Sequence, residues 1–192
     1  MRRSNSERTE TMRAALIAAA RRLFVEKGYA DTSTPDIVAA AGVTRGALYH
    51  HFEDKKALFA AVVAEEARKV SEEIESASAG SATARDGILD GTRAYFDALT
   101  VPGRIRLLLL DGPSVLGADT MQRLNEAHSE ASLKQGLREL FAASGKAPDL
   151  LDAFAGLLGA AFDRAALAIA AGASRKEYEA AITALIDGIS VR

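Results

Sequence analysis

The chain lacks cysteine and tryptophan altogether, and its 192 residues include only three histidines and four prolines. Without cysteine it can form neither a disulfide framework nor a thiol-based redox sensor. With no cysteine and three histidines, the chain has few residues that could form a catalytic nucleophile–base pair or a metal cluster. It also contains no Gly-rich phosphate loop. We therefore expect no catalytic site, no metal site and no cofactor.

Long hydrophobic runs are absent as well. No stretch approaches the roughly 20 uncharged apolar residues that a membrane span needs. The first ten residues, MRRSNSERTE, are charged and contain no apolar signal segment. Apolar residues still make up 48% of the chain, enough for one large core or two modest ones. These features predict a cytoplasmic protein with no membrane partner.

Charge is distributed unevenly along the sequence. Residues 1–60 hold ten Lys and Arg against seven Asp and Glu, a net charge of +3, and the other 132 residues hold fourteen against nineteen, a net charge of −5. A basic end favours contact with nucleic acid, although a bias of this size also occurs in many domains with no such partner.

The pattern of apolar residues predicts an all-α protein. No segment alternates with a period of two over a useful length, so we expect no strand. A small-residue stretch at 76–84 predicts a loop between two domains, and the sequence DGPS at 111–114 predicts a turn. Helices are expected at 8–27, 55–78, 83–99, 103–110, 119–143, 147–171 and 174–190.

Residues 34–56, TPDIVAAAGVTRGALYHHFEDKK, predict two short helices joined by a tight turn. Thr34 can cap the first helix ahead of Pro35, whose fixed φ suits a first helical turn. Gly42 can adopt the left-handed conformation that ends a helix, and Thr44 can cap the next one. This is the arrangement of a helix-turn-helix DNA-binding motif. The residues expected inside are Val38, Val43, Leu48 and Phe52.

Residues 28–59, from the Gly28-Tyr29 helix stop through the AGV turn and the LYHHF segment, resemble the DNA-binding signature of the TetR family of bacterial transcriptional regulators. Val38 is a small departure, because the family more often has Ala there. The resemblance implies an N-terminal three-helix DNA-binding domain, expected at 1–55. It also implies a helical ligand-binding and dimerisation domain, expected at 56–192, with a linking helix at about 55–78.

The second helix of the motif should place its first turns in the major groove of DNA. There Arg45 could donate two hydrogen bonds to guanine, although a solvated surface arginine remains open. Gly46 favours close approach of the backbone to DNA or packing against the preceding helix. The resemblance implies DNA contacts for Tyr49 and His50. The full predicted set is Ser33, Thr34, Thr44, Arg45, Gly46, Tyr49, His50 and Lys55, in which Ser33 and Thr34 could equally serve as caps and Lys55 is expected to bind a phosphate.

Two apolar helices near the carboxyl end predict a homodimer interface made of two helices from each subunit. The resemblance implies the same arrangement, and purely intramolecular packing is the alternative. A two-fold dimer would read an inverted-repeat operator in double-stranded DNA. The predicted interface residues are Phe154, Leu157, Leu158, Ala161, Phe162, Ala165, Tyr178, Ile182, Leu185 and Ile186.

Residues 83–143 are expected to line a chamber for an unidentified small-molecule effector of apolar or amphipathic character. Each candidate contact could instead be structural. The candidates are Tyr95, Phe96, Arg104, Asp111, Met121, His128, Phe162 and Arg164.

The function implied is a repressor that leaves its operator when the effector binds. A coupling of about 1–3 kcal/mol would weaken operator binding roughly 5–150-fold. Two alternatives stay open: an activator of the same fold, and a helical adaptor protein that does not bind DNA.

Overall fold

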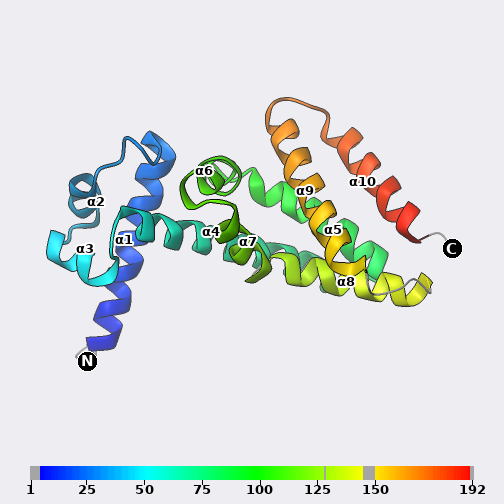
Figure 1. The fold of residues 1–192 in the computed structure, drawn as a ribbon, viewed down its shortest axis with the longest axis horizontal. Helices are drawn as coiled ribbons and strands as arrows, with labels where there is room; N and C mark the ends of the chain where they lie inside the picture. Colours follow the sequence, from blue (N-terminus) through cyan, green and yellow to red (C-terminus); the bar gives the residue numbers. More distant parts are fainter. Residues whose placement is uncertain (1–4, 128, 145–149, 191–192) are drawn as a thin grey trace. The chain divides into compact units, whose positions relative to one another are not determined.

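Helices form nearly all of the computed structural model, which describes residues 5–127, 129–144 and 150–190. No strand occurs in these three ranges, as the apolar pattern predicts. The elements in chain order are α1 (Asn5–Lys27), α2 (Thr34–Ala41), α3 (Arg45–His51), α4 (Lys55–Ser78), α5 (Ala84–Leu99), the π-helix η1 (Arg106–Asp111), α6 (Gly112–Leu116), α7 (Ala118–Ala127), α8 (Ser129–Ser144), α9 (Leu151–Ala170) and α10 (Arg175–Ser190) (Figure 1).

The chain forms two compact units whose limits differ from the expected domains. The first unit ends at Glu66 and also includes Arg106–Met121, and the second comprises Ala67–Ile105 and the residues from Gln122 onward. Helix α4, expected to link the domains, thus contributes one half to each unit. The segment 106–121, expected in the ligand-binding domain, groups with the helix-turn-helix.

The core of the first unit joins α1, α2, α3 and the first half of α4. Phe24 of α1 and Phe59 of α4 are fully buried and meet edge to face, with ring centroids 5.0 Å apart. Ile37 of α2 and Leu48 of α3 are also fully buried, and Phe52 is nearly so. Val38 and Val43, expected inside, are half-buried. The apolar face of each short helix is therefore covered, which holds α2 and α3 against α1 and α4.

The segment 106–121 contains helix where a turn was expected. Residues 106–111 form a π-helix, a rare geometry that is frequent at functional sites. Gly112–Leu116 then form α6, so the turn predicted at 111–114 is wrong. Pro113 lies in the first turn of α6, where a missing backbone N–H costs nothing.

Arg106 of this segment lies at the carboxyl end of α1. Its Nη1 donates to the Val25 carbonyl oxygen at 3.3 Å, and its Nε donates to the Asp111 carboxylate at 3.1 Å. Gly28 ends α1 with a φ of +85°, and a Cβ there would lie 2.3 Å from Arg106 Nη2. A cation at a helix carboxyl end is favourable, so Arg106 joins η1 to α1 within the first unit.

The core of the second unit is built from α5, α8, α9 and α10. Leu137 and Phe141 of α8, Leu158 of α9 and Ile186 of α10 are buried. Phe141 also meets Phe154 of α9 edge to face, with ring centroids 5.4 Å apart. These contacts leave one side of α9 and α10 uncovered, where Leu157 is 69% and Leu185 is 52% exposed.

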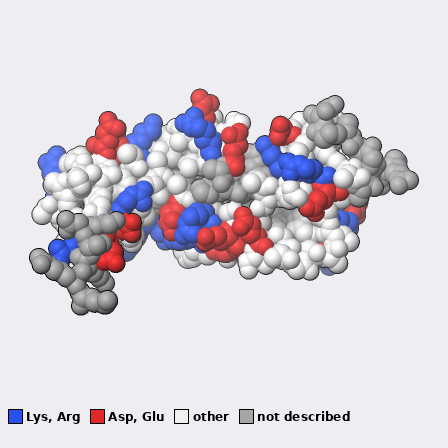
Figure 2. Space-filling model, turned by 90° about the horizontal axis from the view of Figure 1, so that it is seen from below, with Lys and Arg blue, Asp and Glu red and all other residues white. Residues whose placement is uncertain are grey.

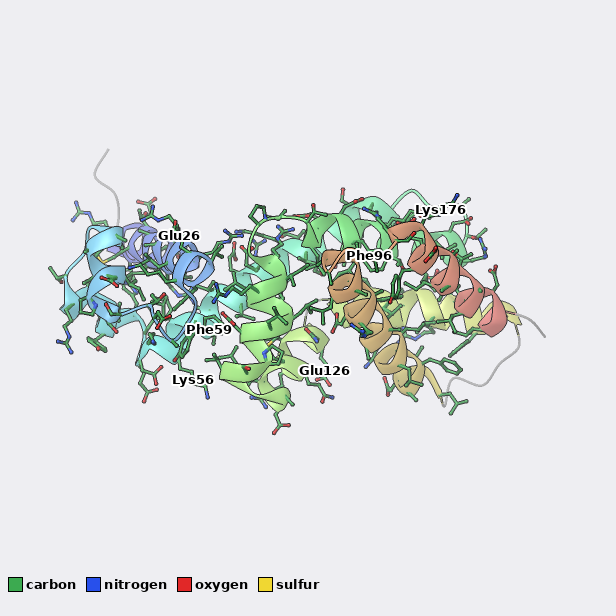
Figure 3. The ribbon with its side chains drawn as sticks, turned by 90° about the horizontal axis from the view of Figure 1, so that it is seen from above. Glu26, Lys56, Phe59, Phe96, Glu126 and Lys176 are labelled. Atoms are coloured by element: carbon green, nitrogen blue, oxygen red, sulfur yellow. The ribbon has the colours of Figure 1, made fainter. Side chains whose placement is uncertain are left out.

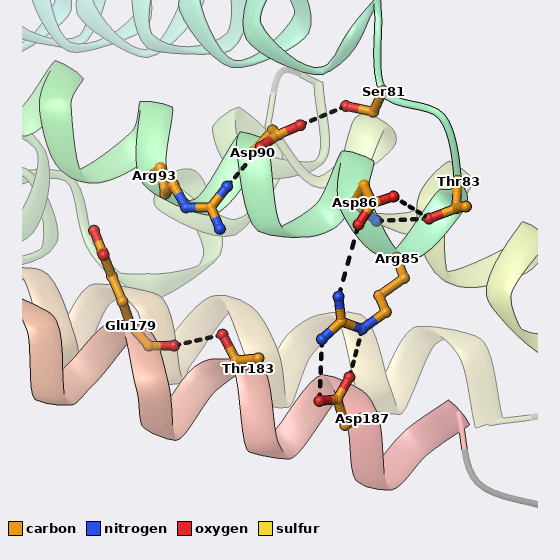
Figure 4. A network of polar contacts seen from close by, with 9 residues as sticks. All are labelled: Ser81, Thr83, Arg85, Asp86, Asp90, Arg93, Glu179, Thr183 and Asp187. Carbon is orange, nitrogen blue, oxygen red and sulfur yellow. Dashed lines mark hydrogen bonds and ion pairs between the residues drawn. The ribbon is translucent and has the colours of Figure 1, made fainter.

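Two ion pairs tie α10 to α5, and the cation comes from α5 in one pair and from α10 in the other. Near the end of α10, Asp187 accepts from Arg85 of α5 at 2.5 and 3.1 Å (Figure 4). At the beginning of α10, Arg175 donates to Asp97 of α5 at 2.5 Å. The hydrogen bond from Arg85 lowers the pKa of the Asp187 carboxyl. Each helix supplies one cation and one anion, so the two helices are held together near both ends of α10.

Candidate nucleic-acid interface

The start of α2 is fixed by Ser33, one of the two residues that could serve as its cap. Its backbone is extended, with φ −93° and ψ 152°, and its Oγ accepts a hydrogen bond from the Asp36 N–H at 3.2 Å. Thr34, predicted as the cap, is instead the first residue of the helix, and the Asp36 N–H that a cap must accept bonds to Ser33. The prediction was wrong by one residue.

The turn between α2 and α3 confirms the expected backbone geometry. Gly42 has φ 66° and ψ 30°, the left-handed conformation, and its N–H donates to the Ala39 carbonyl oxygen at 3.3 Å. Thr44 is extended, and its Oγ1 accepts from the Ala47 N–H at 3.2 Å. The three residues 42–44 therefore end one helix and start the next, which orients α3 against α2.

Helix α3 presents a polar outer face. Arg45, Gly46, Tyr49 and His50 are exposed, whereas Leu48 on the opposite face is fully buried. The Arg45 guanidinium lies over the Tyr49 ring, 5.5 Å from its centroid. Arg45 and Tyr49 are four residues apart and so share one side of the helix. The result is a cation with free access to solvent, supported by an aromatic ring.

Gly46 lies at an open position on this face. A Cβ there would meet only the Thr44 Oγ1, at 3.9 Å, which is an ordinary contact. Packing against α2, one of the two expected reasons for a glycine, is thus not a requirement at this position. Close approach of the backbone to a ligand remains the prediction.

His51 contrasts with its exposed neighbour. It is half-buried at the end of α3, and its ring centroid lies 5.3 Å from that of His50. Burial lowers the pKa of His51, and the nearby charges of His50 and Arg13 lower it further. Arg13 also lies over the Phe52 ring, 5.3 Å from its centroid. Burial thus favours a neutral His51 that packs against the domain.

Lys55 faces the protein, although it was expected to bind a phosphate. Its ammonium donates to the carbonyl oxygens of Tyr29 at 2.8 Å, Thr32 at 3.0 Å and Ala30 at 3.5 Å. It also lies 4.3 Å from the centroid of the Tyr29 ring. Its three N–H groups are directed at the turn that precedes α2.

The predicted effector contacts in the second unit are held by neighbouring side chains. Tyr95 donates to the Asp163 carboxylate at 2.5 Å, and burial raises the pKa of both groups. Arg104 is buried and makes two hydrogen bonds with Glu73, at 2.7 and 3.0 Å. Phe96 is buried as well (Figure 3).

The other predicted effector contacts are divided between the two units. Asp111 and Met121 belong to the first unit, where Asp111 accepts from Arg106 and Met121 lies beside Gly112. Phe162 is half-buried and Arg164 is exposed, while His128 lies outside the described residues. An open hollow of about 440 Å³ contains none of the predicted residues and is lined by Lys69, Glu72, Glu73, Ser76 and Ala77 of α4.

The predicted dimer interface needs a correction. Leu158, Ala165, Ile182 and Ile186 are at most 5% exposed and belong to the core of their own chain. Leu157 and Leu185 are exposed, and Phe154, Ala161, Phe162 and Tyr178 are half-buried. The periodicity marked both sides of α9 and α10 as apolar, so it could not separate the side facing inward from the side left open.

Helix α9 has the length and the apolar character of a membrane span, with a mean hydropathy of 1.5 over 18 residues. One such helix is weak evidence of a membrane span, and α9 carries Asp163 and Arg164 in its middle. Over the face of the molecule in Figure 2, Lys and Arg alternate with Asp and Glu. Among the residues that the structure describes, no three His, Asp or Glu side chains are grouped as metal ligands would be.

Two family models match the chain. One is described as bacterial regulatory proteins, tetR family, and matches residues 16–62. The other is described as tetracyclin repressor-like, C-terminal domain, and matches residues 85–189. Together they cover the helix-turn-helix and most of the second unit.

Individual relatives agree with the family models. The HTH-type transcriptional repressor BepR of Brucella suis is 45% identical over 74 residues, which are 38% of this chain and 34% of that protein. The HTH-type transcriptional regulator AcrR of Shigella flexneri is 42% identical over 62 residues, 32% of this chain and 29% of that protein. The chain thus spans about a third of the length of the curated relatives it matches.

Solved structures extend the likeness to the whole chain. A TetR-family transcriptional regulator from Pectobacterium atrosepticum is 35% identical, with a TM-score of 0.73 over 96% of this chain and 94% of that chain. FadR from Bacillus subtilis, solved with stearoyl-CoA, has a TM-score of 0.73 over 90% of this chain and 96% of that chain at 18% identity, which shows a shared fold alone.

Proposed function

This chain belongs to the TetR family of bacterial regulatory proteins, and from that premise we propose that it is an effector-released repressor that binds an inverted-repeat operator as a homodimer. Members of the family are DNA-binding transcription factors rather than enzymes. The observation that carries the proposal is the outer face of α3, where Arg45, Tyr49 and His50 are exposed on a helix capped at both ends.

In the proposed complex, the amino-terminal turns of α3 enter the major groove. Arg45 donates two hydrogen bonds to the O6/N7 edge of guanine, a contact worth about 1–3 kcal/mol of discrimination. Tyr49 and His50, one turn later, reach phosphates or bases. Gly46 allows the backbone to come close. Ser33, Thr34 and Thr44 lie at the helix amino ends, where N–H groups and the helix dipole favour a phosphate.

The proposed dimer buries the uncovered side of α9 and α10. Leu157 and Leu185 would lie at its centre, with the half-buried Phe154, Phe162 and Tyr178 around them. A Cβ at Gly156 would meet nothing within 4 Å, and the same holds at Gly159, so a partner helix could approach closely here. Two α3 helices related by a two-fold axis would read half-sites about 34–36 Å apart or somewhat farther.

The proposed effector binds in the second unit. Tyr95 and Asp163 are half-buried and hydrogen-bonded to each other, and they supply the polar handles that such a ligand would need. Binding that favours a DNA-incompetent state by about 1–3 kcal/mol would release the operator, and operator DNA would weaken effector binding by the same factor. We place the protein in the cytoplasm, where its operator is.

Fluorescence anisotropy tests the proposal. Purified protein is titrated against labelled DNA from upstream of its own and neighbouring genes, with random duplex as competitor, at a stated near-physiological salt concentration. We expect binding that survives the competitor and that is lost when Arg45 and Tyr49 are changed to Ala. Lys176→Ala, which removes an exposed charge from α10, serves as the control and should bind as wild type does.

The outcomes separate the alternatives. Specific binding that persists in Arg45→Ala/Tyr49→Ala would exclude α3 as the reader, and failure to bind any upstream fragment would favour a helical adaptor. A reporter gene behind the identified operator then distinguishes repression from activation, since deletion of a repressor raises transcription.

A further inference from the structure

The ammonium of Lys55 is bound to the turn that leads into the helix-turn-helix. Its hydrogen bonds to the Tyr29 and Thr32 carbonyl oxygens, at 2.8 and 3.0 Å, are short, and the contact with Ala30 is at 3.5 Å. An ammonium group has three donors, and all three point at this turn. A phosphate could be bound by Lys55 only at the cost of these contacts.

Tyr29 makes the same turn rigid from its other side. Its ring lies 5.8 Å from the Phe24 ring and 5.0 Å from the Phe59 ring, measured between centroids, and Lys55 lies over it at 4.3 Å. A cation over an aromatic face is attracted by the electron density of the ring. Burial raises the pKa of the Tyr29 hydroxyl, and the nearby charge of Asp54 raises it further. Lys55 is thus held by both the backbone and the side chain of this residue.

Thr32 connects the turn to the start of α2. It is fully buried, and its hydroxyl lies 2.7 Å from the Gly28 carbonyl oxygen and 3.2 Å from that of Leu23. The next residue, Ser33, caps α2. Any movement of the Tyr29–Thr32 turn would therefore move this cap and the first turn of α2.

From this geometry we propose that Lys55 serves DNA binding as a positioning residue, which fixes the Tyr29–Thr32 turn and through it α2 and α3, and that it does not bind a phosphate. The inference rests on the proposed function of DNA binding. It predicts that both the charge and the shape of the lysine are required. An arginine has a planar fork of donors that suits a phosphate but cannot direct three N–H groups at three carbonyl oxygens around one point.

Three variants separate the two roles. Lys55→Met removes the charge, and Lys55→Arg keeps it with a different shape. Lys56→Met removes the same charge from the next residue, whose side chain is exposed (Figure 3), and is the matched control. Hydrogen exchange of the full-length protein reports on the turn without any DNA. We expect faster exchange across residues 29–41 in both Lys55 variants and wild-type exchange in Lys56→Met.

Binding to a random-sequence 30-base-pair duplex is then measured by anisotropy at several salt concentrations, at a temperature where each variant is fully folded by circular dichroism. We expect roughly tenfold weaker binding in both Lys55→Met and Lys55→Arg, as for the loss of a charged hydrogen bond. The slope of log affinity against log salt should stay at the wild-type value.

Two results would overturn the inference. One is wild-type exchange in Lys55→Met. The other is wild-type affinity in Lys55→Arg combined with a slope in Lys55→Met that is smaller by about 0.9 per subunit, the signature of one lost phosphate contact. A wild-type protein that binds no duplex at all would contradict the proposed function instead, and the exchange data would still decide whether Lys55 holds the turn.

Discussion

The helix-turn-helix and the α9–α10 pair are held in place by different kinds of interaction. Helices α2 and α3 begin and end at residues that act on their immediate neighbours: Ser33, Gly42 and Thr44. Helix α9 begins at Leu151, and the residue before it, Leu150, provides no side-chain cap. Helix α10 is tied to α5 by Arg85–Asp187, whose partners are 102 residues apart in sequence.

The difference shows which contacts each region requires. In the helix-turn-helix, local caps set where each short helix begins and ends, and this suits a surface that must match the fixed spacing of DNA. The α9–α10 pair depends on distant partners and leaves Leu157 and Leu185 exposed, on the side that the proposed dimer would cover. Four changes test this contrast, taken from the largest expected effect to the smallest.

Leu48→Ala should cause the largest loss of stability. The side chain is fully buried in α3, and a cavity of this kind costs about 2–5 kcal/mol of unfolding free energy. Leu157→Ala, at a side chain that is 69% exposed, should cost about 1 kcal/mol or less. Urea unfolding followed by circular dichroism measures both. Equal losses of unfolding free energy would mean that the Leu157 side chain is packed within its own chain as fully as that of Leu48.

Leu185→Glu should dissociate the proposed dimer without unfolding the subunit. Burial of a leucine contributes about 1.5–3 kcal/mol, and a two-fold interface contains the residue twice, so a roughly 100-fold or greater weakening is expected. Light scattering after size exclusion measures the molecular mass. Val101→Glu, at an exposed apolar residue outside α9 and α10, is the control and should leave the mass unchanged. A dimeric Leu185→Glu protein would place the interface elsewhere.

Gly28→Ala should destabilise the protein by about 2 kcal/mol. A left-handed residue with a side chain costs about 1–2 kcal/mol, and the new Cβ would displace Arg106 from the end of α1. Gly42→Ala carries the same backbone strain at a position where a Cβ meets nothing within 4 Å, so it should cost about 1 kcal/mol. Thermal unfolding compares the two. Identical losses would show that Arg106 can swing aside freely.

His51 should make stability fall in mild acid. Its pKa is lower in the folded protein than the value of about 6.5 expected in the unfolded chain, so the unfolded state binds more protons between these two values. Stability from the neutral His51 is therefore complete above pH 6.5 and is lost as the pH falls through the folded-state pKa. We expect His51→Gln to flatten the dependence of melting temperature on pH between 5 and 7. An equal fall in both proteins would contradict this.

Sequence patterns were sufficient for the all-α fold and for the helix-turn-helix, because both depend on nearby residues. The predicted bounds of 55–78 for α4 are those observed. The left-handed Gly42 and the Thr44 cap are also observed, since a turn of this kind admits few residue types. The exposure of Arg45 and Tyr49 follows from the burial of Leu48 on the other side of the same short helix.

Partners distant in sequence could not be predicted in the same way. Nothing near Arg106 indicates that it lies against Gly28, 78 residues earlier, and nothing near Tyr95 indicates Asp163. Lys55 was assigned to phosphate because a lysine at a helix amino end has an obvious anionic partner, whereas its carbonyl partners lie 23–26 residues away. The effector contacts remain a prediction for the same reason.

The position of Arg106 has a consequence for engineered regulators. Hybrid repressors are made by joining the DNA-binding helices of one protein to the sensing domain of another, and the end of α4 is an obvious crossover point. In this chain the compact unit around the helix-turn-helix also includes Arg106–Met121. A crossover at the end of α4, residue 78, would place a foreign side chain against Gly28, whereas a hybrid that also carries residues 106–121 from this chain would retain the native one.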